Sequence, residues 1–180
     1  SMQPLCVEQG GFRACRSTLD QVVVLGELIA ACKKRYKKPP CVAYLDIKAA
    51  YDSVPRQLLW KKCSAKRLSP AVVACLEQLF DGNDSFVTIN GVNSRSFHHP
   101  AGVQQGAILS PLLYSIFIDD LPEALRGRDL EDDLLVNCVM YADDVAIVAK
   151  DPVALQKLLD RAQVHAVANY YRFATSKCVV

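Results

Sequence analysis

The chain has 180 residues, enough for one domain with a real core or for one large lobe of a larger protein. Half of the residues are hydrophobic and 22% are charged, which is typical of a globular chain and excludes a disordered one. The net charge of +2 is low for a strong polyanion binder, so any contact with nucleic acid must come from local patches or from parts outside this chain.

The eight cysteines are scattered among apolar residues, with no CxxC motif and no paired Cys/His spacing. This argues against a structural zinc site and predicts buried free thiols in a reducing, intracellular compartment, either nucleus or cytoplasm. No apolar run reaches membrane-spanning length and no secretory signal is recognised, so no membrane partner is expected.

The first predicted element is a helix that begins at Ser17, after an irregular segment at 5–16. Ser17 and Asp20 resemble a capping box, and apolar residues follow at helical spacing: Leu19, Val22, Val23, Gly26 and Ile29. The helix should end in the basic run 33–38, before two prolines. That run could contact a phosphate backbone, but basic residues also suit a helix C-terminus, and we favour this second interpretation.

The middle of the chain predicts a strand, two helices and a hairpin. The strand covers 41–47, and the helices begin at Pro55 and at Ser69-Pro70 and run to about Lys66 and Phe80. The hairpin is centred on Asn90-Gly91, a dipeptide typical of tight turns between strands.

The last part of the chain predicts a helix from Ser110-Pro111, two strands within 136–149, and a long helix from Asp151-Pro152. The final residues, 177–180, resemble the start of another strand. The order of elements predicts an α+β layer, with helices packed on a mostly antiparallel sheet.

Three pairs of adjacent aspartates carry different predictions. Asp119-Asp120 follows an apolar helix and predicts a helix end or kink, and Asp132-Asp133 lies in a mixed charge run and predicts a solvated loop. Asp143-Asp144 lies between two apolar stretches, where carboxylates cost free energy unless they are paired or bound to metal. From this segment alone, the pair is either an acidic hairpin tip or part of a site.

Asp46 favours the interpretation that Asp143-Asp144 is part of a site, because Asp46 too lies near the end of an apolar strand. Since adjacent strand residues point to opposite faces, Asp46 and one of Asp143 and Asp144 could share a face if their strands are neighbours. Convergent carboxylates can hold two divalent cations about 3.5–4 Å apart for an in-line displacement at phosphorus, and Mg²⁺ prefers such ligands.

Several motifs together resemble the reverse transcriptases, in the form carried by non-LTR retrotransposons and group II introns. In family order they are QGGFRACRSTLDQ (9–21), LDIKAAYDSV (45–54), GVQQGAILSPLLYSIF (102–117), YADD (141–144) and, more weakly, FATSKC (173–178). The resemblance implies the α+β polymerase right-hand palm, a ferredoxin-like antiparallel sheet with helices on one face, plus part of the fingers. It implies a partial fingers segment at 1–40 and a palm at 41–180. The palm is interrupted by a fingers-like hairpin at about 84–100, and no thumb is present.

The same resemblance implies an RNA-directed DNA polymerase, in which a primer 3′-hydroxyl attacks the α-phosphorus of a dNTP. Asp46 and Asp143 would be the principal metal ligands, with Asp144 beside them, for two Mg²⁺ ions, with Mn²⁺ as an alternative. The implied partners are an RNA or DNA template-primer and the dNTP.

Five further residues match family positions. Tyr51 would exclude a ribose 2′-hydroxyl, or else is a core aromatic, and Gln105-Gly106 would form the turn beside the nascent base pair. Arg13 would hold the triphosphate, or else is a surface arginine. Lys177 would protonate the leaving pyrophosphate, although Ala174 stands where the family usually has asparagine.

Two other functions stay open at this stage. One is a domesticated, catalytically silent descendant that binds nucleic acid or a partner, and the other is a different two-metal enzyme such as a nuclease. Without a thumb, the chain is expected to bind template-primer weakly and to polymerise poorly, and its open apolar surface could support self-association.

Overall fold

The computed structural model describes residues 2–82, 84–99, 101–126 and 137–180. The predicted solvated loop at Asp132-Asp133 lies outside these residues. Within the described ranges, no helix is both long enough and apolar enough to cross a bilayer.

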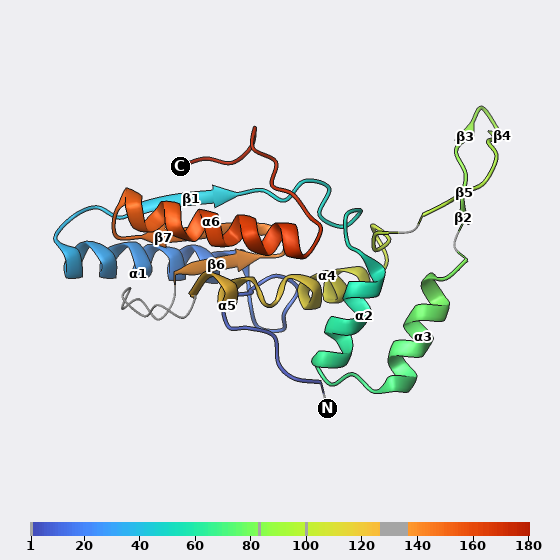
Figure 1. Cartoon of the computed structure of the whole chain (residues 1–180), viewed down its shortest axis with the longest axis horizontal. Coiled ribbons are helices and arrows are strands. Elements are labelled where there is room, and N and C mark those ends of the chain that lie inside the picture. The colour runs from blue at the N-terminus through green and yellow to red at the C-terminus, as the bar shows by residue number, and fades with distance from the viewer. Residues whose placement is uncertain (1, 83, 100, 127–136) are drawn as a thin grey trace.

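The largest sheet among the described residues has three antiparallel strands in the order β1-β7-β6, and it lies in the left part of Figure 1. Its strands are β1 (Cys41–Leu45), β6 (Cys138–Tyr141) and β7 (Asp144–Ala149). Leu45 pairs with Val145, and Tyr141 pairs with Asp144. This register brings the end of β1 and the turn between β6 and β7 to the same edge of the sheet. The strands that lead to Asp46 and to Asp143-Asp144 are therefore neighbours, as a shared site requires.

One face of the sheet packs on α6 (Pro152–Ala168) and α4 (Ser110–Ile118). The core residues on this face alternate along the strands, because adjacent strand residues point to opposite faces, and they are Ala43, Leu45, Cys138, Met140, Val145, Ile147 and Ala149. The predicted α+β fold with an antiparallel palm sheet is confirmed, but the helices lie on both faces of the sheet, because the first helix of the chain packs on the other face.

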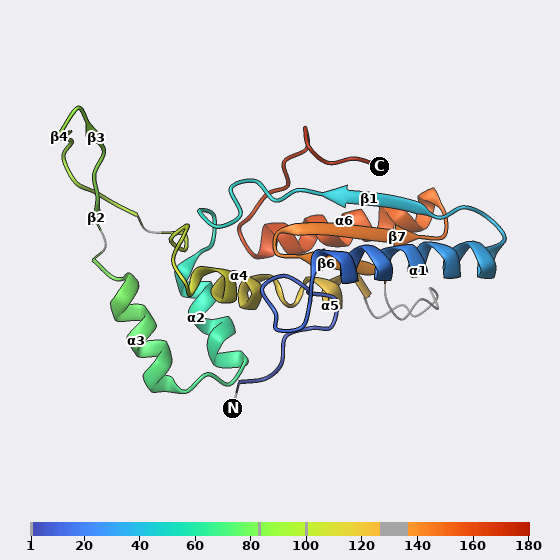
Figure 2. The same cartoon turned by 180° about the vertical axis from the view of Figure 1, so that it is seen from behind.

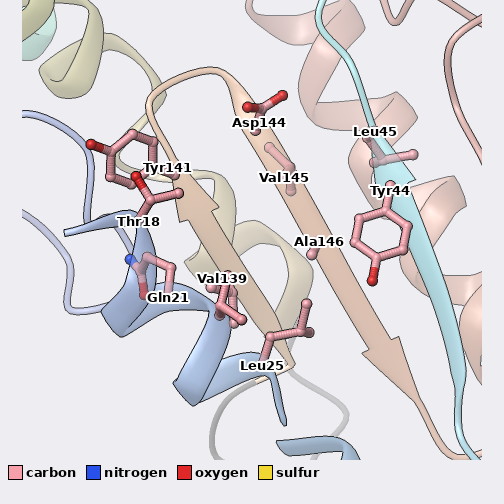
Figure 3. Close-up of a pocket in the computed structure, with 11 residues that line it drawn as sticks. Thr18, Gln21, Leu25, Tyr44, Leu45, Val139, Tyr141, Asp144, Val145 and Ala146 are labelled. Carbon is pink, nitrogen blue, oxygen red and sulfur yellow. The ribbon is translucent and has the colours of Figure 1, made fainter.

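The helix α1 (Thr18–Tyr36) contacts β6 and β7 on the opposite face of the sheet. Figure 3 shows Leu25 of α1 beside Val139 of β6. The predicted capping box is confirmed, because Ser17 accepts from the Asp20 amide and the Asp20 carboxylate accepts from the Ser17 amide.

Of the apolar residues whose helical spacing predicted α1, only Ile29 is partly buried. Leu19, Val22 and Val23 are all more than half exposed. The buried residues are Gln21 and Cys32, with Leu25 and Leu28 partly buried between them. Apolar residues surround the first half of this helix, so their spacing could not select a face. The buried stripe includes Gln21, a polar residue whose Nε2 donates to the carbonyl of Met140 on β6.

Two further helices lie beside α4 and continue from β1. They are α2 (Arg56–Ala65), which contacts α4, and α3 (Pro70–Phe80), which contacts α2. Pro55 and Ser69 flank their first residues as predicted, and the Ser69 hydroxyl caps α3 by accepting from the Val72 amide.

The Asp119-Asp120 pair lies between α4 and a short helix that was not predicted, α5 (Leu121–Arg126), so the predicted helix end or kink is confirmed. Asp119 contacts Lys66, and Asp120 accepts from Lys62 Nζ at 2.7 Å and lies 2.9 Å from His165 Nε2. This pair joins α2, α4 and α6, so it is structural.

The predicted hairpin at Asn90-Gly91 is confirmed, and it projects away from the sheet beyond α3 in both views (Figures 1 and 2). Its inner pair is β3 (Thr88–Ile89) with β4 (Val92–Asn93), and its outer pair is β2 (Asp84–Ser85) with β5 (Phe97–His98).

The predicted final strand at 177–180 is only partly realised. The C-terminal segment touches β1 and its exit at two isolated bridges, Tyr44 with Val179 and Ile47 with Phe173. Between them, the Lys177 amide donates to Ala174 O at 2.8 Å. This turn interrupts the pairing, so no continuous strand forms.

Candidate active site

A cavity of about 440 Å³ lies at the edge of the sheet where β1 and the β6–β7 turn meet. Segments from across the chain contribute to it, and they include many of the side chains singled out from the sequence: Asp46, Tyr51, Gln105, Gly106, Asp143 and Lys177. The fold therefore gathers residues that the sequence could only place in separate motifs.

Asp46 and Asp143 are the two carboxylates that line this cavity. Asp46 directly follows β1, and its carbonyl accepts from the Ala174 amide at 2.8 Å. Lys177 Nζ lies 3.3 Å from Asp46 Oδ2. The Ala174 backbone thus fastens the C-terminal segment to Asp46, and Lys177 reaches the acidic group without the asparagine that the family usually has nearby.

Asp144 takes a different position. It is the first residue of β7, is exposed, and lines a second cavity of about 270 Å³ with α1 and β1 (Figure 3). Partial desolvation of its carboxylate, followed by the nearby charges of Asp143 and Asp46, raises the pKa of Asp144. The charges of Asp46 and Asp143 thus act on Asp144, although only those two line the first cavity.

The choice between the two acids does not follow from strand register. Continuing the pairing of Leu45 with Val145 by one residue would set Asp46 opposite Asp144. The residue beside Asp46 in the cavity is Asp143, because Asp143 lies in the turn, one residue after Ala142, whose φ is 56°. The turn conformation decides which carboxylate faces the cavity.

The donor set fits a magnesium ion better than a zinc ion. No cluster of three or more Asp, Glu, His or Cys side chains in the described part of the chain is arranged to hold a metal by itself. Mg²⁺ is usually bound through one or two carboxylates and completed by water and substrate phosphates, whereas structural zinc takes four protein ligands. Asp46 and Asp143 match the first pattern.

Tyr51 is held rigidly at the side of the cavity. Its ring stacks on Tyr114 of α4, with the ring centroids 5.0 Å apart and the planes inclined by 20°. Tyr114 is 1% exposed. Burial and the charge of Asp143 raise the pKa of both phenols, which stay neutral at physiological pH. Tyr51 is thus a partly buried aromatic that also lines the cavity, and its exclusion of a ribose 2′-hydroxyl stays a prediction.

Gln105 and Gly106 also line this cavity. Gly106 has a φ of +84° and open space around its Cα, so the backbone conformation, rather than crowding, requires glycine there. Gln105 Nε2 donates to the Asp52 carboxylate, at 3.2 and 3.3 Å from its two oxygens. Asp52 thereby turns the Gln105 amide toward the exit from β1.

Arg13 does not line the cavity. Its Nη1 donates to Cys6 O at 2.7 Å and to Gln9 O at 3.0 Å, so here the guanidinium fastens its own loop. A contact with a triphosphate stays a prediction. Its neighbour Phe12 lines the cavity instead, in a backbone conformation with a φ of 55°. Sequence reasoning missed Phe12, although it stands beside Arg13 in the GGFR string.

Comparison with known proteins gives a consistent assignment. The family model described as "Reverse transcriptase (RNA-dependent DNA polymerase)" matches residues 1–180. The chain is similar to the RNA-directed DNA polymerase from mobile element jockey of Drosophila funebris, with 36% identity over 94% of the chain and 19% of the relative. It is also similar to the Pol polyprotein of the R2DM element of Drosophila melanogaster, with 25% identity over 85% of the chain and 15% of the relative. The chain thus spans about a fifth or less of these relatives.

Solved structures agree on the fold. A telomerase of Candida tropicalis without its C-terminal domain superposes with a TM-score of 0.67 and 16% identity, over 96% of this chain and 35% of that one. The telomerase of the same organism in complex with a fragment of telomeric RNA gives a TM-score of 0.68 and 15% identity, over 96% and 30%. At these identities the likeness concerns the fold alone.

Proposed function

Because the chain belongs to the reverse transcriptase (RNA-dependent DNA polymerase) family, we propose that it carries the catalytic core of an RNA-directed DNA polymerase. The reaction is the transfer of a nucleotide from a dNTP to a primer 3′-hydroxyl. One observation carries the proposal: Asp46 and Asp143, from motifs far apart in the sequence, line one cavity together with Tyr51 and Gln105-Gly106.

Asp46 and Asp143, with Asp144 beside them, would hold two divalent cations, Mg²⁺ or Mn²⁺. When bound, these ions make the 3′-hydroxyl more acidic and neutralise the leaving phosphates. The protein supplies the rigidity: Asp46 directly follows a paired strand, and Asp143 lies in a turn between two paired strands. Carboxylates held on such strands need little reorganisation when charge develops in the transition state.

The other cavity residues suit the remaining tasks. Lys177 Nζ, 3.3 Å from Asp46, can give a proton to the leaving pyrophosphate. Tyr51 cannot retreat, because the buried ring of Tyr114 lies behind it, so it would exclude a ribose 2′-hydroxyl by its bulk. The backbone at Gly106 lets the nascent base pair approach closely.

The proposed partners are an RNA or DNA template paired with a primer, and a dNTP. The names of the relatives support this, since several are RNA-directed DNA polymerases of mobile elements. The duplex would pass the cavity at the sheet edge.

Single-nucleotide incorporation tests the proposal. A DNA primer on an RNA template is incubated with the 180-residue chain, Mg²⁺ and one complementary dNTP. Asp46→Asn and Asp143→Asn should each lower the rate by about 10³-fold or more, because each removes a charge that binds the cations. Asp84→Asn, on the exposed hairpin, is the matched control and should keep the wild-type rate.

Two outcomes contradict the proposal. If Asp143→Asn incorporates as fast as wild type, the turn at Ala142 and Asp143 between β6 and β7 (the acidic turn) is not part of the catalytic site. If wild type is saturated with Mn²⁺ and template-primer yet incorporates nothing with either cation, the carboxylates of this chain do not catalyse nucleotide transfer.

A further inference from the structure

The acidic turn is held from outside by the segment that precedes α1. The Met140 amide donates to Glu8 O at 2.9 Å, and the Gly10 amide donates to Met140 O at 2.9 Å. Gln9 and Met140 thus form a parallel bridge on the free edge of β6. This segment reaches the turn just where β6 ends.

The side chain of Gln9 continues this pairing onto Ala142. Its Oε1 accepts from the Ala142 amide at 2.9 Å, and its Nε2 donates to Ala142 O at 3.0 Å. The Gly11 amide also donates to Oε1, at 2.8 Å. Two N–H donors on one side and a carbonyl on the other leave only one satisfactory orientation of the amide. Gln9 is completely buried, so water does not compete for these bonds.

Ala142 needs such support because of its backbone conformation. Its φ of 56° lies in the left-handed region, which is unfavourable for residues other than glycine. A two-residue hairpin in which only the first central residue has a positive φ, as here, normally has glycine at that position. Here both backbone polar groups of Ala142 are bound by one distant side chain.

The two glycines after Gln9 make this approach possible. A Cβ on Gly11 would lie 2.3 Å from the Ala142 nitrogen, and a Cβ on Gly10 would lie 2.1 Å from Gln21 Nε2. The Ala142 backbone cannot move aside without moving the turn. The string Gln9-Gly10-Gly11 is therefore built for close contact with the residue that precedes Asp143.

We propose that Gln9 is a positioning residue for the acidic turn: its amide fixes the backbone of Ala142 and so directs Asp143, rather than Asp144, into the cavity with Asp46. Gln9 does not line the cavity, so it acts through Ala142. A misplacement of about 1 Å in a catalytic group can cost about 10²-fold in rate, so a small rotation at Ala142 matters. The inference rests on the proposed function for its consequence, but the clamp itself can be measured without catalysis.

The test compares Gln9→Met with Gln21→Met. Methionine keeps the length and neutrality of glutamine and removes its hydrogen bonds. Gln21 is also buried and also serves the edge of β6, because its Nε2 donates to Met140 O at 2.9 Å and to Glu8 O at 3.1 Å, but it does not bind Ala142. Figure 3 shows Gln21 beside β6, on the α1 side. Gln9→Asn, whose amide is too short to reach both groups of Ala142, serves if Gln9→Met does not fold.

The first measurement is amide hydrogen exchange and NMR of the folded variants without ligands. Gln9→Met should exchange the Ala142 amide about tenfold faster and shift the Asp143 resonances, whereas Gln21→Met should do neither. The second is Mn²⁺ affinity, measured by electron paramagnetic resonance without nucleic acid or dNTP. Gln9→Met should bind about tenfold more weakly and Gln21→Met within about twofold of wild type.

The third measurement is the Mg²⁺ dependence of incorporation. Gln9→Met should need about tenfold more Mg²⁺ for half-maximal rate, with an unchanged KM for template-primer. Unchanged Ala142 exchange and Asp143 resonances in Gln9→Met would overturn the clamp. Faster Ala142 exchange with wild-type Mn²⁺ affinity would reduce Gln9 to a structural residue. If wild type neither binds Mn²⁺ nor incorporates, the proposed function fails, and exchange and resonances still decide whether Gln9 directs Asp143.

Discussion

Two hairpin turns of this chain adopt positive φ angles, and they are held in opposite ways. In the exposed hairpin, Asn90 and Gly91 have φ angles of 51° and 79°. Three hydrogen bonds that support it are local: Thr88 Oγ1 to Asn93 Oδ1 at 2.8 Å, the Val87 amide to Ser94 Oγ at 2.9 Å, and the Ser94 amide to Val87 O at 2.8 Å. The dipeptide itself favours this conformation.

The acidic turn has no such local code. Ala142 is buried and has a φ of 56°, and its partner Gln9 lies 133 residues earlier. This difference indicates that an exposed turn can be specified by its own residues, whereas the turn that orients Asp143 is specified by contacts with residues far away in the sequence. The following substitutions test this difference between the two turns, beginning with the largest expected effect.

Gly11→Ala should be the most damaging of these changes. Its Cβ would lie 2.3 Å from the Ala142 nitrogen, so the acidic turn must shift. We expect a loss of stability of about 1–3 kcal/mol, and a loss of Mn²⁺ affinity and incorporation of about 10²-fold. Chemical denaturation and Mn²⁺ titration measure the two effects.

Gly91→Ala is the matched control in the other turn. It also has positive φ, but open space surrounds its Cα, so only a conformational cost of about 1–2 kcal/mol applies. Mn²⁺ affinity should not change. Equal losses of affinity in the two glycine variants would mean that the acidic turn is not specifically held.

Asp144→Asn should stabilise the ligand-free protein at neutral pH. Burial and the charges of Asp143 and Asp46 raise the pKa of Asp144, so its carboxylate is disfavoured in the folded state. Because the pKa of Asp144 is higher in the folded than in the unfolded state, this cost grows as the pH rises between the two pKa values and is complete above the folded one. The gain from Asp144→Asn should therefore shrink as the pH falls through the raised pKa and vanish below the unfolded pKa. Urea denaturation across the acidic range measures it.

Asp84→Asn is the counterpart in the exposed hairpin. Asp84 Oδ1 lies 3.7 Å from His98 Nδ1, and both side chains are about half exposed. Such a pair contributes little, about 0–1 kcal/mol, so the change should leave stability nearly constant. A gain from Asp144→Asn that persisted at low pH would refute the electrostatic explanation.

Ala142→Gly should have a small effect. Glycine removes the backbone strain, but it loses a buried methyl group and gives the unfolded chain more freedom, so stability should stay within about 1 kcal/mol. Because Gln9 binds only the backbone of residue 142, Mn²⁺ affinity should stay within about twofold. A Mn²⁺ affinity as low as that of Gln9→Met would mean that the alanine side chain, rather than Gln9, orients Asp143.

Much of the fold followed from short-range patterns. The capping box at Ser17 and Asp20, the cap at Ser69 and the turn at Asn90-Gly91 were all predicted, because each rests on residues within a few positions of one another. The short helix α5 was missed, since it follows α4 almost without interruption.

The candidate site was predicted less completely. Motif matching supplied Asp46, Tyr51, Gln105 and Asp143, which the fold brings into one cavity. It did not supply Phe12, and it assigned Arg13 to the triphosphate although its guanidinium binds the loop backbone here. A side chain that can bind either a ligand or its own loop cannot be assigned from its motif alone.

By itself, the sequence determined the type and limits of many elements, the antiparallel α+β class, and the acids and aromatics that can form a site. Tertiary structure alone decided which face of α1 is buried and which of two adjacent aspartates faces the cavity. It also decided which residue binds the turn between β6 and β7. The reason is physical: caps and tight turns involve bonds between near neighbours, whereas the direction of Asp143 depends on a left-handed Ala142 that Gln9 binds from the far end of the chain.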